Sequence, residues 1–279
     1  MYKIAYKEKL NDSVTLMKIV APDVANKAKA GQFIILRADE EGERIPLTVA
    51  DTDEKEGTVT IIFQIVGATT MALNDKNEGE YIPTFAGPLG KATELDCLKK
   101  VAVVGGGVGS AIAYPIAKAL KKKGAEVHSI IGFRNKDIII LEKEFEKVSD
   151  KLVVCTDDGS YGRKWLVTDA LKELIDGGER YDEVITIGPL MMMKFVAKLT
   201  KEYGIKTVAS MNPIMVDGTG MCGGCRLTVG GKMKFACVDG PDFDAHEVDF
   251  DEVIKRNGVY KEFEKNKREE YCNLYKGVK

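Results

Sequence analysis

Residues 101–110 read Val101-Ala-Val-Val-Gly-Gly-Gly-Val-Gly-Ser110, an apolar run that leads directly into a cluster of glycines. This pattern predicts a buried β-strand, a tight turn and then a helix from Gly109 to Lys122. Free backbone N–H groups at the start of such a helix, together with its dipole, suit a pyrophosphate. Gly105 and Gly107 supply G-x-G, but Ser110 stands where the dinucleotide fingerprint has its third glycine. A tight strand-to-helix turn without a nucleotide is therefore the alternative interpretation.

The chain around this turn alternates buried strands with amphipathic helices. Such alternation predicts a doubly wound parallel sheet, in which ligands bind beyond the carboxyl ends of the strands. The expected strands are residues 101–104, 126–133, 152–156, 183–187 and 206–209, and the expected helices are residues 109–122, 138–147, 166–174 and 190–203.

Three further segments follow directly after expected strands of this sheet. Each could be ordinary loop chemistry if it stood alone, but with the glycine turn they predict a nicotinamide nucleotide site. Asp157 and Asp158 would repel a 2′-phosphate and favour NAD(H), whereas Arg134 favours NADP(H). The nucleotide-binding candidates are Gly105, Gly106, Gly107, Val108, Gly109, Phe133, Arg134, Asp157, Asp158, Gly188, Pro189, Met191 and Met192.

The first ninety or so residues alternate apolar and polar residues in short runs between turn-rich pieces. This texture predicts an antiparallel β-barrel or sandwich. Within it, Arg44-Ile-Pro-Leu-Thr48 places a cation and a hydroxyl near an expected rigid turn. Thr69 and Thr70, at the start of a short expected helix, could bind phosphate or act as an ordinary cap. Gly87-Pro-Leu-Gly90 is either a hinge turn or a backbone wall for a cofactor.

Residues 217–225 read Asp217-Gly-Thr-Gly-Met-Cys222-Gly-Gly-Cys225, and Cys237 follows after eleven further residues. The spacing matches the C-x4-C-x2-C…C pattern of plant-type [2Fe-2S] loops, with aspartate in the first position. The intervening glycines would let backbone N–H groups turn toward a buried cluster. A structural zinc site with three cysteines and one carboxylate is the alternative. Residues 226–229 and 232–236 predict a hairpin that joins Cys225 to Cys237, and the charged, intermittently apolar tail from residue 249 predicts a terminal helix.

The composition argues against several classes of protein. Lys and Arg number 41 against 43 Asp and Glu, a net charge of −2, so the chain lacks the positive excess of a nucleic-acid binder. Lys3, Lys7 and Lys9 interrupt any apolar signal segment. The uncharged run at 101–117 contains three successive glycines and Pro115, which makes it a poor membrane span. The six cysteines show no paired framework of the secreted kind. We therefore expect a cytoplasmic protein without nucleic-acid or membrane partners.

These motifs occur in an order that resembles the ferredoxin-NADP reductase-like flavoproteins. More narrowly, the chain is similar to the dihydroorotate dehydrogenase electron-transfer subunit group over residues 1 to about 250. Its segment Asn212-Pro-Ile-Met-Val-Asp-Gly-Thr-Gly-Met-Cys-Gly-Gly-Cys225 resembles the branch of small (alpha) subunits of NADH-dependent reduced ferredoxin:NADP oxidoreductase, also called sulfide dehydrogenase beta subunits. That branch carries Asp at position 217, where the dihydroorotate-linked subunits carry Cys. Two departures are Trp165, where relatives usually have Gly, and Ile187, where many reductases have Cys.

The resemblance implies an FAD-binding β-barrel domain at residues 1–97, an NAD-binding α/β domain at 98–211, and a [2Fe-2S] loop and hairpin with a helical tail at 212–279. It implies that FAD lies between the barrel and the parallel sheet, and that NAD(H) approaches the glycine turn. The implied FAD-binding residues are Arg44, Pro46, Leu47, Thr48, Val66, Gly67, Thr69, Thr70, Gly87 and Pro88, and the implied iron ligands are Asp217, Cys222, Cys225 and Cys237.

The implied activity is electron transfer: hydride exchange between NAD(H) and FAD, and single electrons through the cluster. In the resembled complex a larger flavin and iron–sulfur subunit oxidises NADPH and bifurcates its electrons to ferredoxin and, through a chain of this kind, to NAD. A hetero-oligomer with such a subunit is expected. No catalytic side chain is assigned, because neither His128 nor His246 has the partners expected of a general base. The alternatives are an electron-transfer subunit of NAD-dependent dihydroorotate dehydrogenase and a zinc-stabilised, non-catalytic nucleotide-binding module.

Overall fold

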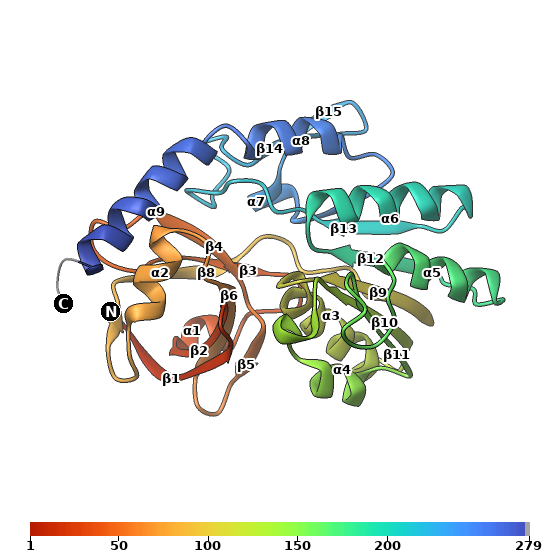
Figure 1. Cartoon of the computed structure of the whole chain (residues 1–279), viewed down its shortest axis with the longest axis horizontal. Coiled ribbons are helices and arrows are strands. Elements are labelled where there is room, and N and C mark those ends of the chain that lie inside the picture. Colours follow the sequence, from red (N-terminus) through yellow and green to blue (C-terminus); the bar gives the residue numbers. More distant parts are fainter. Residues whose placement is uncertain (277–279) are drawn as a thin grey trace.

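The structure is a computed structural model, and it describes residues 1–276. Within this range the strands form sheets of five, three and six strands and one two-stranded hairpin. The two N-terminal sheets lie on one side of the molecule, the six-stranded sheet and its helices on the other, and the C-terminal segment crosses both (Figure 1). No helix of this range is long and apolar enough to cross a membrane.

The N-terminal part consists of two antiparallel sheets around one apolar core. Ile4, Met17 and Ile61 of the larger sheet and Ile34 and Leu36 of the smaller one are fully buried in that core. The larger sheet has the order β5 (Asp51–Asp53), β6 (Thr58–Gln64), β2 (Val14–Val20), β1 (Tyr2–Asn11) and β7 (Tyr81–Ile82). The smaller has the order β4 (Arg44–Thr48), β3 (Phe33–Arg37) and β8 (Thr84–Leu89), and the helices are α1 (Pro22–Ala25) and α2 (Ala68–Asp75).

The prediction of antiparallel strands and of a short helix after Gly67 is confirmed, while closure into a barrel stays a prediction. The expected rigid turn near residues 44–48 is wrong, because this segment is strand β4 and pairs along β3. Gly87-Pro88-Leu89 is likewise not a turn but the end of β8. Both strands contain proline and both lie at the edges of the three-stranded sheet, where the missing N–H group breaks no ladder.

The six-stranded sheet is parallel except for its last strand. Strand β9 lies in the middle of this sheet. From β9 the chain first adds β10 and β11 on one side, and it then adds β12 and β13 on the other side. The carboxyl ends of β9 and β12 therefore flank a crevice. The strands in order are β11 (Lys151–Thr156), β10 (Glu126–Phe133), β9 (Lys100–Gly106), β12 (Glu183–Ile187), β13 (Thr207–Ser210) and the antiparallel β16 (Asp242–Asp244). The helices are α3 (Gly109–Lys122), α4 (Glu142–Val148), α5 (Val167–Asp176) and α6 (Leu190–Glu202).

The predicted parallel sheet is confirmed, and α3 has the predicted bounds. The helix expected from residue 138 begins later, at Glu142. A short 3-10 turn, Lys136–Ile138, comes first, and Leu141 has a φ of 59°, which no α-helix accommodates. Strand β16 was not predicted, and it attaches the C-terminal segment to the edge of the parallel sheet.

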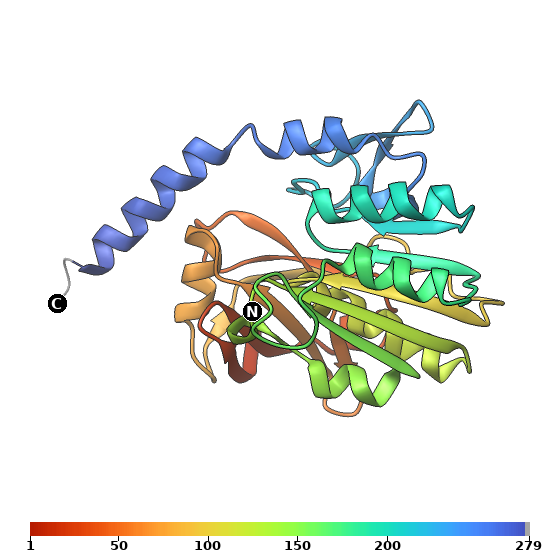
Figure 2. The same ribbon diagram turned by 45° about the vertical axis from the view of Figure 1, so that its right-hand side comes forward.

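The C-terminal segment packs against both of the other parts. Buried residues of β3 (Phe33 and Ile35) share one core with Cys225, Cys237 and Phe250 of this segment. Its last helix projects from the body on the side of α2, which it contacts, and the Tyr271 hydroxyl donates to Asp75 at 2.7 Å (Figure 2). The elements are the predicted hairpin β14 (Arg226–Val229) and β15 (Lys232–Phe235), then α7 (Ala236–Asp239), β16, α8 (Phe250–Asn257) and α9 (Lys261–Lys276). Residues 277–279 of the predicted tail lie outside the described range.

Candidate functional site

A cavity of about 950 Å³ lies where the three parts meet. Its walls come from β4 of the N-terminal sheets, the glycine turn after β9 and the start of α6 after β12, with Met211 and Pro213 from the segment after β13. This volume is at the upper end of the range for small-molecule and cofactor sites. The cavity therefore lies at the predicted crevice of the parallel sheet.

The structure brings many of the predicted nucleotide and flavin residues together at this cavity. Those that line it are Pro46, Leu47, Thr48, Gly106, Gly107, Val108, Gly109, Phe133, Arg134, Asp157, Gly188, Pro189, Met191 and Met192. Those that are not part of its lining are Arg44, Val66, Gly67, Thr69, Thr70, Gly87, Pro88, Gly105 and Asp158.

Close packing explains the glycine turn after β9. A Cβ atom on Gly109 would lie 2.5 Å from the Ile187 carbonyl oxygen and 2.7 Å from the Gly188 Cα. Gly107 has a φ of 55°, and its N–H donates to the Gly132 carbonyl at 2.8 Å, which braces the turn against β10. The start of α3 can thus approach β12 only without side chains, and residues 106–109 of the turn line the cavity.

Asp157 and Asp158 differ in their roles. Asp157 lines the cavity. Asp158 instead caps its own loop, since its Oδ1 accepts from the Ser160 N–H at 2.9 Å. The hydrogen bonds from Ser160 hold the pKa of the Asp158 carboxyl below its usual value. Of the two aspartates, Asp157 is therefore placed to act on a ligand in the cavity.

In the turn at Gly67, the Thr70 side chain forms hydrogen bonds with backbone groups of the turn. The Thr70 hydroxyl accepts from the Val66 and Gly67 N–H groups at 3.0 Å each and donates to the Gly67 carbonyl at 2.9 Å. Thr69 donates to Glu43 at 3.3 Å. Thr70 thus acts as a helix cap here, as the alternative interpretation had it, and phosphate binding at this turn stays a prediction.

Several cavity residues carry no sequence motif and were not predicted. They come from distant segments, and only the fold brings them together. One of them is Trp165, which stands where relatives usually have Gly. The Arg163 guanidinium carbon lies 4.4 Å from the centre of its ring. The others include Ser13, Phe33, Gln64, Leu166, Thr168, Phe195, Lys198, Ser210, Met211 and Asn212.

The cysteine loop has the backbone and the donors that an iron–sulfur cluster requires. Cys225 and Cys237 are buried and Cys222 is exposed, and the Cys237 N–H donates to Cys225 Sγ at 3.4 Å. Gly218, Gly220 and Gly223 have φ values of 80°, 82° and 66°, which side chains other than glycine rarely adopt. The thiol groups are free of disulfides and suit iron or zinc.

Burial and the neighbouring Cys225 raise the pKa of the Cys237 thiol to about 12. Such a thiol keeps its proton at neutral pH unless a metal ion displaces it, because the metal binds the thiolate. Metal binding at this loop would therefore release protons and offset the cost of burying charge. The donor set fits a cluster on these grounds.

The cysteine loop lies directly on the smaller N-terminal sheet. A Cβ atom on Gly218 would lie 2.7 Å from Ile35 Cδ1 and 2.8 Å from Leu89 Cδ1, so the loop backbone packs closely against side chains of strands β3 and β8. Phe33, one of the two β3 residues that share the core with Cys225 and Cys237, also lines the cavity. Phe33 therefore belongs both to the core around the two cysteines and to the cavity wall.

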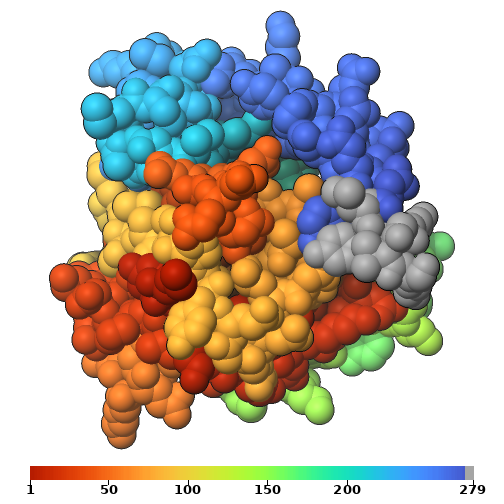
Figure 3. Space-filling model, turned by 90° about the vertical axis from the view of Figure 1, so that its left-hand side faces the viewer, coloured from red at the N-terminus to blue at the C-terminus, as the bar shows by residue number. Residues whose placement is uncertain are grey.

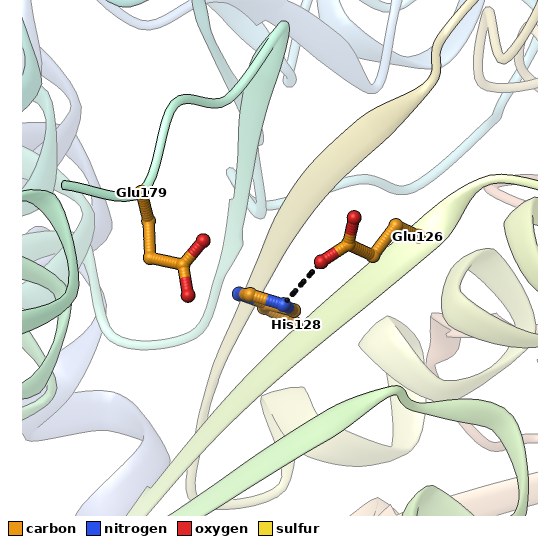
Figure 4. A group of neighbouring side chains, drawn as sticks. All are labelled: Glu126, His128 and Glu179. Carbon is orange, nitrogen blue, oxygen red and sulfur yellow. Dashed lines mark hydrogen bonds and ion pairs between the residues drawn. The ribbon is translucent and has the colours of Figure 1, made fainter.

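A second group of possible metal ligands lies away from the cavity, at the amino-terminal ends of the strands. Glu126, His128 and Glu179 place their donor atoms within 4.8 Å of one another (Figure 4). Lys100 Nζ already lies between the two carboxylates, 2.8 Å from Glu126 and 2.5 Å from Glu179. His128 Nε2 lies 3.0 Å from Glu126 and its Nδ1 lies 2.9 Å from the Tyr181 hydroxyl. Ammonium and imidazole groups thus satisfy the carboxylates, and we interpret the group as a structural ion-pair network.

Acidification is expected to destabilise the fold through His128. Burial lowers the pKa of His128 below the ordinary histidine value of about 6.5, so the folded protein favours the neutral imidazole. As the pH decreases below about 6.5, the His128 imidazole is protonated in the unfolded chain before it is protonated in the folded protein. The free energy of unfolding therefore decreases as the pH decreases, until the pH reaches the folded-state pKa of His128. Denaturant unfolding from about pH 7.5 to about pH 5 measures the effect.

The matched variants are His128→Gln and His246→Gln, since the chain has two histidines. His128→Gln should flatten the pH dependence of the unfolding midpoint, and His246→Gln serves as the comparison for loss of an imidazole elsewhere in the chain. Equal slopes in the wild type and His128→Gln would contradict the prediction.

The comparisons with known proteins agree with this geometry. Residues 212–249 match the model of the iron-sulfur cluster binding domain of dihydroorotate dehydrogenase B. The chain is 48% identical over 263 residues to a Thermotoga maritima protein, a homolog of the dihydroorotate dehydrogenase B (NAD(+)) electron transfer subunit, with 94% of this chain and 93% of that protein covered. The chain belongs to the family of these electron-transfer subunits. An uncharacterised protein of Clostridium beijerinckii is 53% identical over 94% of this chain and 91% of its own length.

Solved structures extend the similarity. The chain resembles a chain of the NADH-dependent reduced ferredoxin-NADP oxidoreductase, with 46% identity, a TM-score of 0.92 and 98% of each chain covered. The fold is shared with the cytochrome b5 reductase domain of Ulva prolifera nitrate reductase, at 17% identity and a TM-score of 0.61. That match covers 75% of this chain and 95% of the reductase domain chain. The protein is thus an oxidoreductase subunit with a ferredoxin-reductase-like fold, and its relatives support FAD, NAD and an iron–sulfur cluster as its cofactors.

Proposed function

We propose that this chain is the small electron-transfer subunit of an NADH-dependent reduced ferredoxin:NADP oxidoreductase that bifurcates electrons. The observation that carries the proposal is the similarity to that solved enzyme over nearly the whole of both chains. Asp217, at the first ligand position of the cysteine loop, supports the same branch, because the resemblance assigns Cys to this position in dihydroorotate-linked subunits.

Each part of the chain has a role in this proposal. A bound flavin would exchange a hydride with a nicotinamide and single electrons with an iron–sulfur cluster. Strand β4 would hold the flavin with Pro46, Leu47 and Thr48, and the turn at residues 106–109 would direct N–H groups to a nicotinamide nucleotide. Asp217, Cys222, Cys225 and Cys237 would hold the cluster. The packing of the loop on β3 and β8 would fix the distance between cluster and flavin.

The finer predictions belong to the same proposal. They are the FAD, NAD and cluster domains at 1–97, 98–211 and 212–279, a closed N-terminal barrel, and a cytoplasmic location. The predicted partner is a larger flavin and iron–sulfur subunit, which would connect the chain to ferredoxin and NADP(H). An electron carrier of this kind needs an acceptor, and the relatives' designation as electron-transfer subunits supports one.

Co-purification from the native source tests the proposal. The expected complex contains a second, larger flavoprotein and couples NADPH oxidation to the reduction of both ferredoxin and NAD, with flavin and iron–sulfur signals from this chain. A complex in which NAD reduction proceeds at the same rate without ferredoxin would contradict it.

Names within the family favour a second function, the electron-transfer subunit of NAD-dependent dihydroorotate dehydrogenase. The matching family model and the Thermotoga maritima relative both carry that name. It requires the same cavity and cysteine loop but a different partner. NAD reduction driven by dihydroorotate in the purified complex would establish this second function in place of the first.

We predict that Asp157 favours NAD(H) over NADP(H). Its carboxylate lines the cavity and would repel a 2′-phosphate. Asp157→Ser should raise the NADPH to NADH ratio of kcat/KM by about tenfold, the equivalent of about 1.4 kcal/mol. Steady-state diaphorase kinetics with both nucleotides measures it. Asp158→Asn is the matched control and should leave the ratio unchanged, because Asp158 does not line the cavity.

A further inference from the structure

Arg44, predicted to bind flavin, has its charged partner in the cysteine loop. Arg44 Nη1 lies 3.9 Å from Asp217 Oδ1, and the two side chains are 46% and 27% exposed. The Thr219 hydroxyl donates to the other oxygen, Asp217 Oδ2. The space-filling view shows the segment around residue 40, in orange, directly below the light-blue segment that contains the cysteine loop (Figure 3). Both oxygens of the Asp217 carboxylate thus have a partner.

The placement of this pair follows from packing. Gly218, the residue after Asp217, fits against Ile35 of β3 and Leu89 of β8, and β4 is the neighbouring strand of β3. Arg44 is the first residue of β4, and it is not among the residues that line the cavity. Its strand-mate Thr48 does line the cavity. The two ends of β4 therefore lie at different sites, Arg44 at the cysteine loop and Thr48 at the cavity.

Resting on the proposed function, we propose that Arg44 is a positioning residue for the iron–sulfur site. It orients the Asp217 carboxylate as the fourth donor and supplies a positive charge beside it. Asp217 needs such a partner because Gly218 and Gly220, both at positive φ, leave its own loop with few side-chain restraints. Loss of a group that orients a metal ligand typically costs about 10–100-fold in metal affinity, and such groups also tune the redox potential of the metal.

The sign of the electrostatic effect follows from charge. Reduction adds an electron to the cluster, and a nearby guanidinium stabilises the more negative state. Arg44 should therefore raise the cluster's reduction potential, and its removal should lower it. Because both side chains are partly exposed, the shift should shrink as the salt concentration rises.

Redox titration of the purified full chain tests this inference, with the cluster followed by electron paramagnetic resonance and its retention by iron content after a chelator challenge. Arg44→Gln is expected to lower the reduction potential of the cluster and to speed iron loss. Arg44→Lys, which keeps the positive charge, should have a potential close to that of the wild type. In the Asp217→Asn background, Arg44→Gln should no longer speed iron loss, because the carboxylate that Arg44 orients is gone, while the loss of its charge should still lower the potential. If the Asp217→Asn protein does not assemble a cluster, the reduction potentials and iron retention of Arg44→Gln and Arg44→Lys are compared with those of the wild type instead.

The matched control is Arg37→Gln. Arg37 is the direct cross-strand partner of Arg44, but its Nε donates to the Gly42 carbonyl at 3.1 Å instead. Its replacement should leave the cluster potential unchanged. An unchanged potential and iron retention in Arg44→Gln, or equal shifts from Arg37→Gln and Arg44→Gln, would overturn the inference. Wild-type protein without cluster or flavin would refute the proposed function itself, so the two failures are distinguishable.

Discussion

Replacing Cys225 with alanine is expected to abolish the iron–sulfur cluster. Cys225 is buried, and its sulfur lies within hydrogen-bonding distance of the Cys237 backbone, so no other donor can take its place without rearrangement of the loop. Loss of a group that only orients a metal ligand costs about 10–100-fold in affinity, and loss of the thiolate itself should cost more. Visible absorption, electron paramagnetic resonance and iron content should therefore fall to background.

The same variant separates the two halves of the proposed electron path. The cavity does not include Cys225, so flavin content and hydride-dependent diaphorase activity should survive, while transfer to the partner subunit is lost. The matched control is Cys97→Ala, because Cys97 is exposed and lies outside the cysteine loop. Retention of zinc in place of iron in the wild type would favour a structural zinc site, and a persistent cluster in Cys225→Ala would contradict the ligand assignment.

The second large effect is expected from Gly109→Ala. A methyl group there meets backbone atoms at 2.5 Å and 2.7 Å, and backbone yields less readily than a flexible side chain. The start of α3 must move away from β12, at a cost of about 1–3 kcal/mol in the free energy of unfolding. Since the same turn carries the predicted pyrophosphate site, the KM for NADH should rise by at least about tenfold, as expected when one interaction of about 1.4 kcal/mol is lost.

Gly124→Ala provides the control at the other end of α3. Gly124 has a φ of 86° and open space around it, so alanine there costs stability through backbone strain alone. Denaturant unfolding and NADH kinetics should show a stability loss in both variants and a KM change in Gly109→Ala alone. Equal KM values for both variants would show that the turn does not bind the nucleotide.

Local patterns predicted the elements whose signal lies in neighbouring residues. Strand β9 and helix α3 follow from an apolar run, a glycine turn and helical periodicity, and the hairpin β14–β15 from two short runs around Gly230-Gly231. The local sequence favours a turn at Pro46 and a hinge turn or a cofactor wall at Pro88, whereas the structure places both prolines in strands. Edge strands tolerate proline, but whether a strand lies at an edge depends on partners far away in the sequence.

Local sequence is enough to identify the two types of site: a glycine turn between strand and helix, and a loop of thiols spaced for a metal cluster. It could do so because turn geometry and metal spacing depend on residues close together in the chain. Which groups meet depends on the folded arrangement of distant segments, and it becomes visible only in the structure. The fold placed Phe33, Trp165 and Phe195 in one cavity, kept Asp157 there but not Asp158, and brought Arg44 to Asp217. Those contacts depend on how sheets and loops pack, and no local pattern encodes the packing of segments so far apart.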